Sequence, residues 1–174
     1  QILLGFQIAN DIKGEWTPDI RLDWQLDLPT GNFQKLATKR LGTDVTGVGA
    51  FQTGPVFIVH KELYLGKNPT ALKASFLYLF PSNVSVKGRN NYGGGPNTRG
   101  TVHPGQNLQL FLSFEQSFGQ QWGGGFDFLY IWQNKSTFSG HLGTDAHGNL
   151  ATMGTPRTNQ FSLAPFIECT YSSQ

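Results

Sequence analysis

The sequence predicts an all-β protein: an antiparallel up-and-down transmembrane β-barrel, of which the chain supplies a seven-strand segment. Three observations predict this fold. Several segments alternate between polar and large apolar residues, the connections between them alternate between short and long, and aromatic residues gather at both ends of the segments. A period of two residues is typical of a β-strand with one apolar and one polar face. Bacterial outer-membrane barrels combine such strands with short turns at one end and long loops at the other.

The clearest alternation lies in residues 20–28, which read IRLDWQLDL. Every even position there is large and apolar, and every odd position is charged or carries an amide. Weaker forms of the pattern recur along the chain, whereas no segment shows a helical period of useful length. The candidate strands are residues 1–9, 17–29, 48–63, 70–82, 105–118, 122–137 and 158–172.

The lengths of the connections follow a second regularity. Short turns are expected near residues 10–16, 64–69 and 119–121, and long loops near residues 30–47, 83–104 and 138–157. In an up-and-down meander these two groups fall at opposite ends of the strands. A soluble β-sandwich gives no reason for such sorting, but an outer-membrane barrel does, since its long loops face outward.

Aromatic side chains mark both ends of the predicted strands, as membrane–water interfaces favour. The short-turn end carries Trp16, Tyr64, Phe118 and Trp122, and the loop end carries Phe80, Trp132 and Phe161. Strands of ten or more residues are also long enough to cross a bilayer at a tilt. Seven is an odd number of strands, and the final residues YSSQ lack the terminal aromatic residue usual in such barrels. We therefore expect residues 1–174 to form a single, incomplete barrel domain that belongs to a larger barrel.

Composition excludes several other classes of protein. The net charge is only +2 and there is no dense run of Lys or Arg, which argues against a nucleic-acid partner. A single cysteine, Cys169, excludes an internal disulfide. No apolar run is long enough for a transmembrane helix.

On the polar face of the predicted strands, seven ionic residues are candidates for lining the lumen of the barrel. They are Arg21, Asp23, Asp27, Lys73, Glu115, Asp127 and Glu168. Five acids against two bases indicate a polar path that mildly prefers cations. The alternative is a wall of mutually paired, hydrated charges that selects nothing.

Basic residues predominate in the long loops and could form a basic outer rim. They are Lys35, Lys39, Arg40, Lys87, Arg89, Arg99 and Arg157, against the acids Asp44 and Asp145. Such a rim could bind lipopolysaccharide phosphates or gather anionic solutes. The alternative is ordinary solvation of surface loops. Residues 92–100, YGGGPNTRG, lack the Lys-Ser/Thr ending and following helix of a phosphate-binding loop, so we expect a flexible or inward-folded loop there.

The sequence does not indicate an enzyme, a cofactor or a metal centre. No candidate nucleophile lies at a sequence spacing from a possible general base that would indicate a catalytic pair. His141, Asp145 and His147 could ligate a metal, but they are three candidate ligands in a stretch that reads as a mobile loop. We therefore predict neither catalytic residues nor metal ligands.

The loop motifs carry a resemblance to a known family. The matching stretches are LPTGNFQKLATKRLGTDVTGVGAFQT (28–53), FPSNVSVKGRNNYGGGPNTRGTVHPG (80–105), NKSTFSG (134–140) and TNQFSLAPFIE (158–168). They resemble the outer-membrane family described as the putative MetA pathway of phenol degradation, a group of transporter-like barrels. The ending CTYSSQ departs from that family's pattern, in which further strands follow. The resemblance implies uptake of small, often aromatic or hydrophobic compounds.

These observations favour a channel in the outer membrane of a Gram-negative bacterium. Its expected partners are outer-membrane lipid, lipopolysaccharide and a small-molecule solute, with no cofactor. Two alternatives remain open from the sequence: a soluble β-sandwich that binds carbohydrate or another ligand, and a barrel that conducts nothing and serves as an adhesin or structural surface protein.

Overall fold

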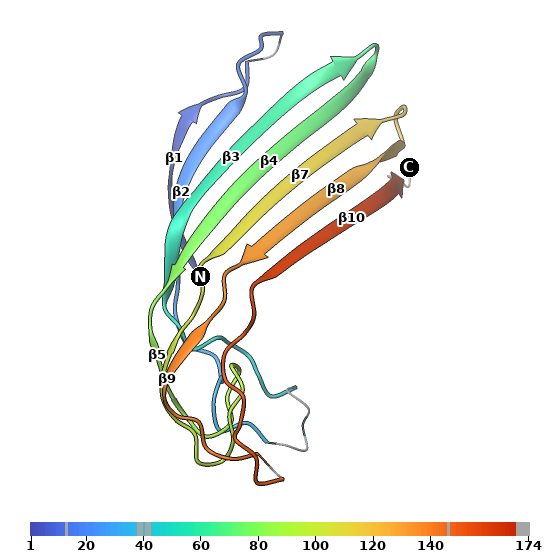
Figure 1. Cartoon of the computed structure of the whole chain (residues 1–174). Helices are drawn as coiled ribbons and strands as arrows, with labels where there is room; N and C mark the ends of the chain where they lie inside the picture. Colours follow the sequence, from blue (N-terminus) through green and yellow to red (C-terminus); the bar gives the residue numbers. More distant parts are fainter. Residues whose placement is uncertain (13, 38–39, 41–42, 146, 170–174) are drawn as a thin grey trace.

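The computed structural model describes residues 1–12, 14–37, 40, 43–145 and 147–169, which form two antiparallel β-sheets (Figure 1). The predicted all-β, antiparallel class is therefore confirmed. The described part of the chain contains no helix long and apolar enough to cross a membrane.

The large sheet has seven strands, and its spatial order is the order of the sequence, as in an up-and-down meander. The strands are β1 (Ile2–Ala9), β2 (Asp19–Asp27), β3 (Gln52–Leu65), β4 (Asn68–Pro81), β7 (Asn107–Ser117), β8 (Trp122–Gln133) and β10 (Thr158–Cys169). The sheet is curved and open, with β1 at one edge and β10 at the other (Figure 1). It is not closed into a barrel.

The small sheet lies within the segments that the sequence predicts as long loops. It has three strands, in the order β5 (Val84–Lys87), β6 (Arg99–His103) and β9 (Thr137–His141). These strands have four or five residues each. Such short strands separated by Gly- and Asn-rich turns give no extended alternation, so the sequence pattern did not reveal them.

The described residues of 28–51, 82–106 and 134–157 form one folded unit, which we call the cap. Its core contains three valines of the small sheet, of which Val102 is 0% exposed, together with Ala50 and Tyr92. Backbone hydrogen bonds join its three segments: Asn91 donates to Phe33 at 2.8 Å, and Gly94 donates to Thr152 at 2.9 Å. The long connections therefore pack against one another in the structure.

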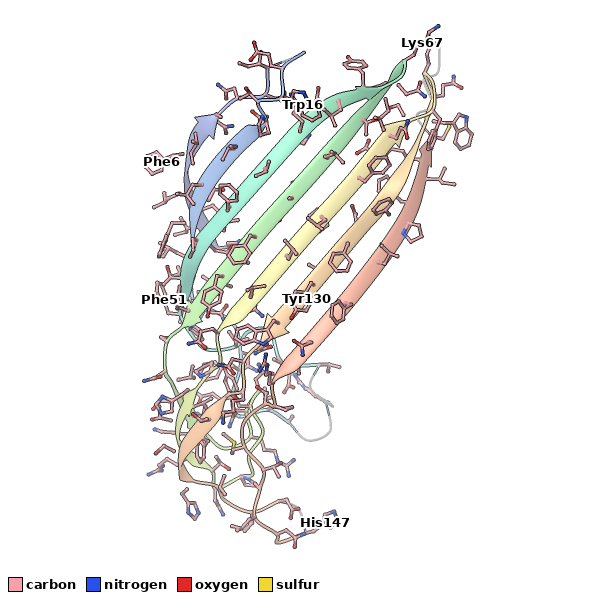
Figure 2. All side chains as sticks on the ribbon, turned by 45° about the horizontal axis from the view of Figure 1, so that its top comes forward. Phe6, Trp16, Phe51, Lys67, Tyr130 and His147 are labelled. Atoms are coloured by element: carbon pink, nitrogen blue, oxygen red, sulfur yellow. The ribbon has the colours of Figure 1, made fainter. Side chains whose placement is uncertain are left out.

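The strand register gives the large sheet two distinct faces. One row across the sheet places Leu22, Phe57, Phe76, Leu110, Tyr130 and Phe161 on the same side. We call this side the apolar face. Its large side chains project from a single layer of strands (Figure 2), and Phe161 is 72% exposed. Within the described residues, no second sheet covers this face.

Candidate functional site: the polar face beneath the cap

All seven ionic residues predicted to line a lumen lie on the side of the large sheet opposite the apolar face, according to the strand register. We call this side the polar face. Its side chains form three groups that overlap along the strands: ionic residues, apolar residues in the middle of β3, β4, β7 and β8, and amide side chains toward the cap.

The ionic residues form two sets, and the set on β2 extends to the cap end of that strand, where Asp27 pairs with Gln52. On β2, the Arg21 Nε donates to the Asp23 carboxylate at 2.6 Å, and the Gln25 amide donates to Asp27 at 2.8 Å. Asp23 is only 3% exposed, because Gly5 lies opposite it on β1 and leaves room for the carboxylate. The charges of Arg21 and Asp23 compensate one another, so this pair adds little net charge to the face.

The acids on the last three strands of the sheet are gathered together. Glu115 on β7 interacts with Glu168 on β10 and with Asp127 on β8. Lys73 shares a row with Asp127, with Ser113 between them. The structure therefore brings the acids on β7, β8 and β10 into one group and leaves the β2 residues apart from it.

An apolar band crosses the middle of the polar face. In the sequence these side chains interrupt the alternation, but the register aligns them in two adjoining rows. One row holds Val56, Leu77 and Ile131, with Gln109 between Leu77 and Ile131. The next row holds Ile58, Phe111 and Leu129, with Ser75 between Ile58 and Phe111. The face is therefore not a uniformly polar surface, and an apolar group could lie against its centre.

A cavity of about 340 Å³ lies where the polar face meets the cap. Amide side chains line it from both sides: the sheet contributes Gln52, Asn107, Gln109 and Gln133, and the cap contributes Asn91. Leu79 and Tyr92 supply apolar surface beside these amides. Amides both donate and accept hydrogen bonds and carry no net charge, so the cavity suits a neutral solute with a polar group.

Sequence reasoning missed these amides because it searched the polar positions for charge. A signal was present, since Gln52, Asn107, Gln109 and Gln133 all fall on polar-face positions near the loop ends of their strands. Their meeting with Asn91, however, depends on how the cap folds back over the sheet.

Tyr92 joins all three segments of the cap. Its hydroxyl donates to the Val48 carbonyl at 2.8 Å, its amide donates to Asn90 Oδ1 at 2.9 Å, and its carbonyl accepts from the Gly154 amide at 2.9 Å. Burial raises the pKa of Tyr92 to about 12. The phenol therefore stays a neutral donor at physiological pH and fixes one wall of the cavity.

The structure places the described bases of the predicted outer rim in different parts of the cap. Lys87 and Arg99 are cross-strand partners in the small sheet, whereas the Arg157 guanidinium lies 5.4 Å from the ring centre of Trp132. Lys35 and Arg40 are exposed in the first cap segment, and Arg89 is half-buried in the second. Lys39 lies outside the described residues.

The segment that contains His141, Asp145 and His147 forms a turn organised by its own backbone. The Asp145 carboxylate accepts from the amides of Asn149 and His147 at 2.9 and 2.8 Å. These hydrogen bonds, that from Asn149 first, lower the pKa of Asp145. Among the described residues, no group of three or more His, Cys, Asp or Glu side chains is placed to hold a metal ion.

No protein-family model matches the chain. No curated protein matches it either.

Proposed function

We propose that the chain forms part of the wall of a β-barrel in the outer membrane of a Gram-negative bacterium. In this proposal the apolar face contacts lipid, the polar face lines a path through the barrel, and the cap narrows the outer mouth of that path. The solutes are small molecules that combine an aromatic or hydrophobic part with a neutral polar group. The observation that carries the proposal is the pairing of an uncovered apolar face with an opposite face that ends beneath a folded cap.

The dimensions of the large sheet support a membrane location. Strand β4 has 14 residues, which corresponds to about 46 Å of extended chain and about 33 Å across a membrane at a tilt of about 45°. A hydrocarbon core is about 30 Å thick. The apolar face would then lie in hydrocarbon, while the two edge strands pair with further strands, because open sheet edges are not tolerated in lipid.

The apolar band supports the assignment of the solute. A path lined only by ions and amides would hold water tightly and would disfavour an aromatic ring. The band of Val56, Leu77 and Phe111 and its neighbours offers a ring a surface on which to shed water. The amides at the cap would bind its polar group before it reaches the band. The resemblance to the transporter-like barrel family points toward the same class of solute.

The soluble-sandwich alternative requires a cover for the apolar face. A sandwich buries the apolar side of each sheet against a second sheet about 10 Å away. The described residues place no second sheet there, and the small sheet belongs to the cap. An uncovered apolar face of seven strands is far larger than the patches that soluble monomers tolerate.

Solute flux through the protein tests the proposal. Liposomes that contain the complete protein should admit phenyl glucoside faster than methyl glucoside, because both are neutral sugars and only one carries a ring. The double variant Phe111→Ser/Leu129→Ser should lower phenyl glucoside flux severalfold and leave methyl glucoside flux nearly unchanged. Ser162→Ala, on the same row of β10, serves as the matched control.

Two results would overturn the proposal. If the protein opens no path for either sugar, the barrel serves as an adhesin or a structural protein instead. If the double variant slows both sugars equally, the apolar band does not distinguish the ring, and the solute assignment is wrong.

A further inference from the structure

The exposed face of the small sheet combines basic and hydroxyl side chains. The register aligns Lys87, Arg99 and His141 as neighbours across β5, β6 and β9. The next row on the same face is made of hydroxyl side chains, namely Ser85, Thr101 and Ser139. The face is therefore a row of basic groups beside a row of hydroxyl groups, and we call it the basic ladder.

Among the described residues, none of these three bases forms an ion pair with a carboxylate. The sequence contains no Asp or Glu between Glu62 and Glu115, nor between Asp127 and Asp145, and these stretches include all three strands. Lys87, Arg99 and His141 are all exposed. Lys87 and Arg99 carry like charges as cross-strand neighbours and repel one another, so an anion bound between them would relieve that repulsion.

The basic groups border a hollow of about 590 Å³, whose lining also includes residues 96–98. Its size accommodates a phosphorylated sugar. Arg and Lys bind phosphate oxygens through charge-assisted hydrogen bonds, and the hydroxyls of Ser85, Thr101 and Ser139 match the hydroxyls of a sugar ring.

The basic ladder faces away from the proposed solute path. The opposite face of the small sheet packs Val84, Val86 and Val102 into the core that contains Tyr92. Tyr92 in turn lines the cavity over the polar face. Because the two faces of a sheet point in opposite directions, the basic ladder looks toward the surroundings of the barrel.

The position of the small sheet limits the distance between the basic ladder and the end of the large sheet. Strands β5 and β9 lie beyond the end of the large sheet (Figure 1). Lys87 follows the end of β4 at Pro81 by six residues, a reach of at most about 20 Å. This bound keeps the basic ladder within reach of the sugar chain of a glycolipid, which extends beyond the roughly 5–8 Å of a simple phospholipid headgroup layer.

We propose that the basic ladder binds the phosphorylated sugar headgroup of a glycolipid that surrounds the barrel in the outer leaflet. This inference rests on the proposed membrane location. Lys87 and Arg99 bind the phosphate together with His141, and the hydroxyl row binds the adjoining sugar. The contact would hold the cap in a fixed position relative to the membrane surface.

Titration of the complete, detergent-solubilised protein tests the inference. Lipopolysaccharide, the same lipopolysaccharide after removal of its phosphates, and inorganic pyrophosphate are the three probes. We expect the intact glycolipid to bind at least tenfold more tightly than the dephosphorylated form. The variant Lys87→Gln/Arg99→Gln should lose about tenfold or more of that affinity for each charge removed, since each charge-assisted hydrogen bond contributes on that scale. Lys35→Gln/Arg40→Gln removes the same charge from elsewhere in the cap and should change the affinity less than threefold.

The possible outcomes distinguish failure of the basic ladder as a phosphate site from failure of the proposed membrane location. Equal affinity for the intact and dephosphorylated glycolipid, or equal loss in both double variants, would overturn the basic ladder as a phosphate site. Tight binding of pyrophosphate without preference for the glycolipid would assign the site to a soluble anion instead. Insertion into phosphatidylcholine vesicles is measured separately, and failure there would overturn the proposed function and with it the glycolipid.

Discussion

Replacement of Tyr92 by Phe tests whether the cap is one folded unit tied through this residue. Tyr92 is 6% exposed, and its hydroxyl donates to the Val48 carbonyl at 2.8 Å. Phe keeps the ring but leaves that carbonyl without its donor, which costs about 0.5–1.5 kcal/mol. Ala also removes the ring from the core of the cap, which costs about 3–5 kcal/mol.

Hydrogen exchange of the amides that join the cap segments measures this loss. The reporters are the amides of Asn91, Gly94 and Gly154, which donate across the segments. Their exchange should speed up about 2- to 13-fold in Tyr92→Phe and more than about 100-fold in Tyr92→Ala, according to the same free energies. Amides in the middle of β4 should exchange at the wild-type rate in both variants.

The titration of Tyr92 gives the same test a pH dependence. Burial raises the pKa of the phenol from 10.0 to about 12 in the folded cap. The folded state therefore favours the protonated phenol, so its contribution is complete below pH 10 and is lost as the pH rises toward 12. Cap exchange that shows no additional rise in this window relative to Tyr92→Phe, or that rises equally in β4, would refute the role given to Tyr92.

Three further predictions concern the large sheet and its turns. Leu22→Arg on the apolar face should cost about 2–4 kcal/mol of folding free energy in a bilayer. Asp23→Asn on the polar face should still assemble. Equal tolerance of both changes in a vesicle-folding assay would contradict the assignment of the faces. Gly54→Ala should abolish pairing of β3 with β4, because its methyl group would overlap the Tyr78 carbonyl. Gly66→Ala has open space around it and should cost only about 1–2 kcal/mol of folding free energy. Equal folded yields of the two variants would refute this difference. Asp11→Asn should expose the Glu62 amide to exchange, because Asp11 accepts from that amide and pairs with the buried Lys61. The hydrogen bond from Lys61 chiefly lowers the pKa of Asp11, so wild-type protection of Glu62 should fade as the pH drops below 3.8 and through the lowered folded value. Protection that survives at acidic pH would contradict this contribution.

The sequence carried most of the information about the large sheet. Alternation such as that of IRLDWQLDL can be recognised in the sequence, because every second side chain of a strand lies on the same face and this depends only on neighbouring residues. It placed Asp23 and Glu115 on one face and Leu22 and Phe161 on the other, as the register does. The order of the strands in the sheet is their order in the sequence, with short turns joining β1 to β2, β3 to β4 and β7 to β8.

The cap and the centre of the polar face depend on distant residues and were not predictable in the same way. Val84 and Val86 alternate with Ser85 and Lys87, but four residues of alternation do not distinguish a strand from a loop. Leu77 and Phe111 disturb the polar pattern of their own strands, and only the register between strands shows that they adjoin other apolar residues. The amide-lined cavity required both the register and the fold of the cap.

Spin labels along β4 test directly whether the apolar face contacts lipid and the polar face contacts water. Single cysteines at positions 72–78, with Cys169 replaced by Ser, would each carry a nitroxide in the complete protein in bilayers. Relaxation by oxygen reports lipid, and relaxation by a water-soluble nickel complex reports water.

Labels at Leu72, Phe76 and Tyr78 should respond to oxygen, and those at Lys73 and Leu77 to nickel. Leu77 is the most telling position, because an apolar residue would enter lipid if hydropathy alone decided its location. We expect nickel access at Leu77 and an alternation of period two along the strand. Oxygen access at Leu77, or nickel access without alternation at all these positions, would contradict it.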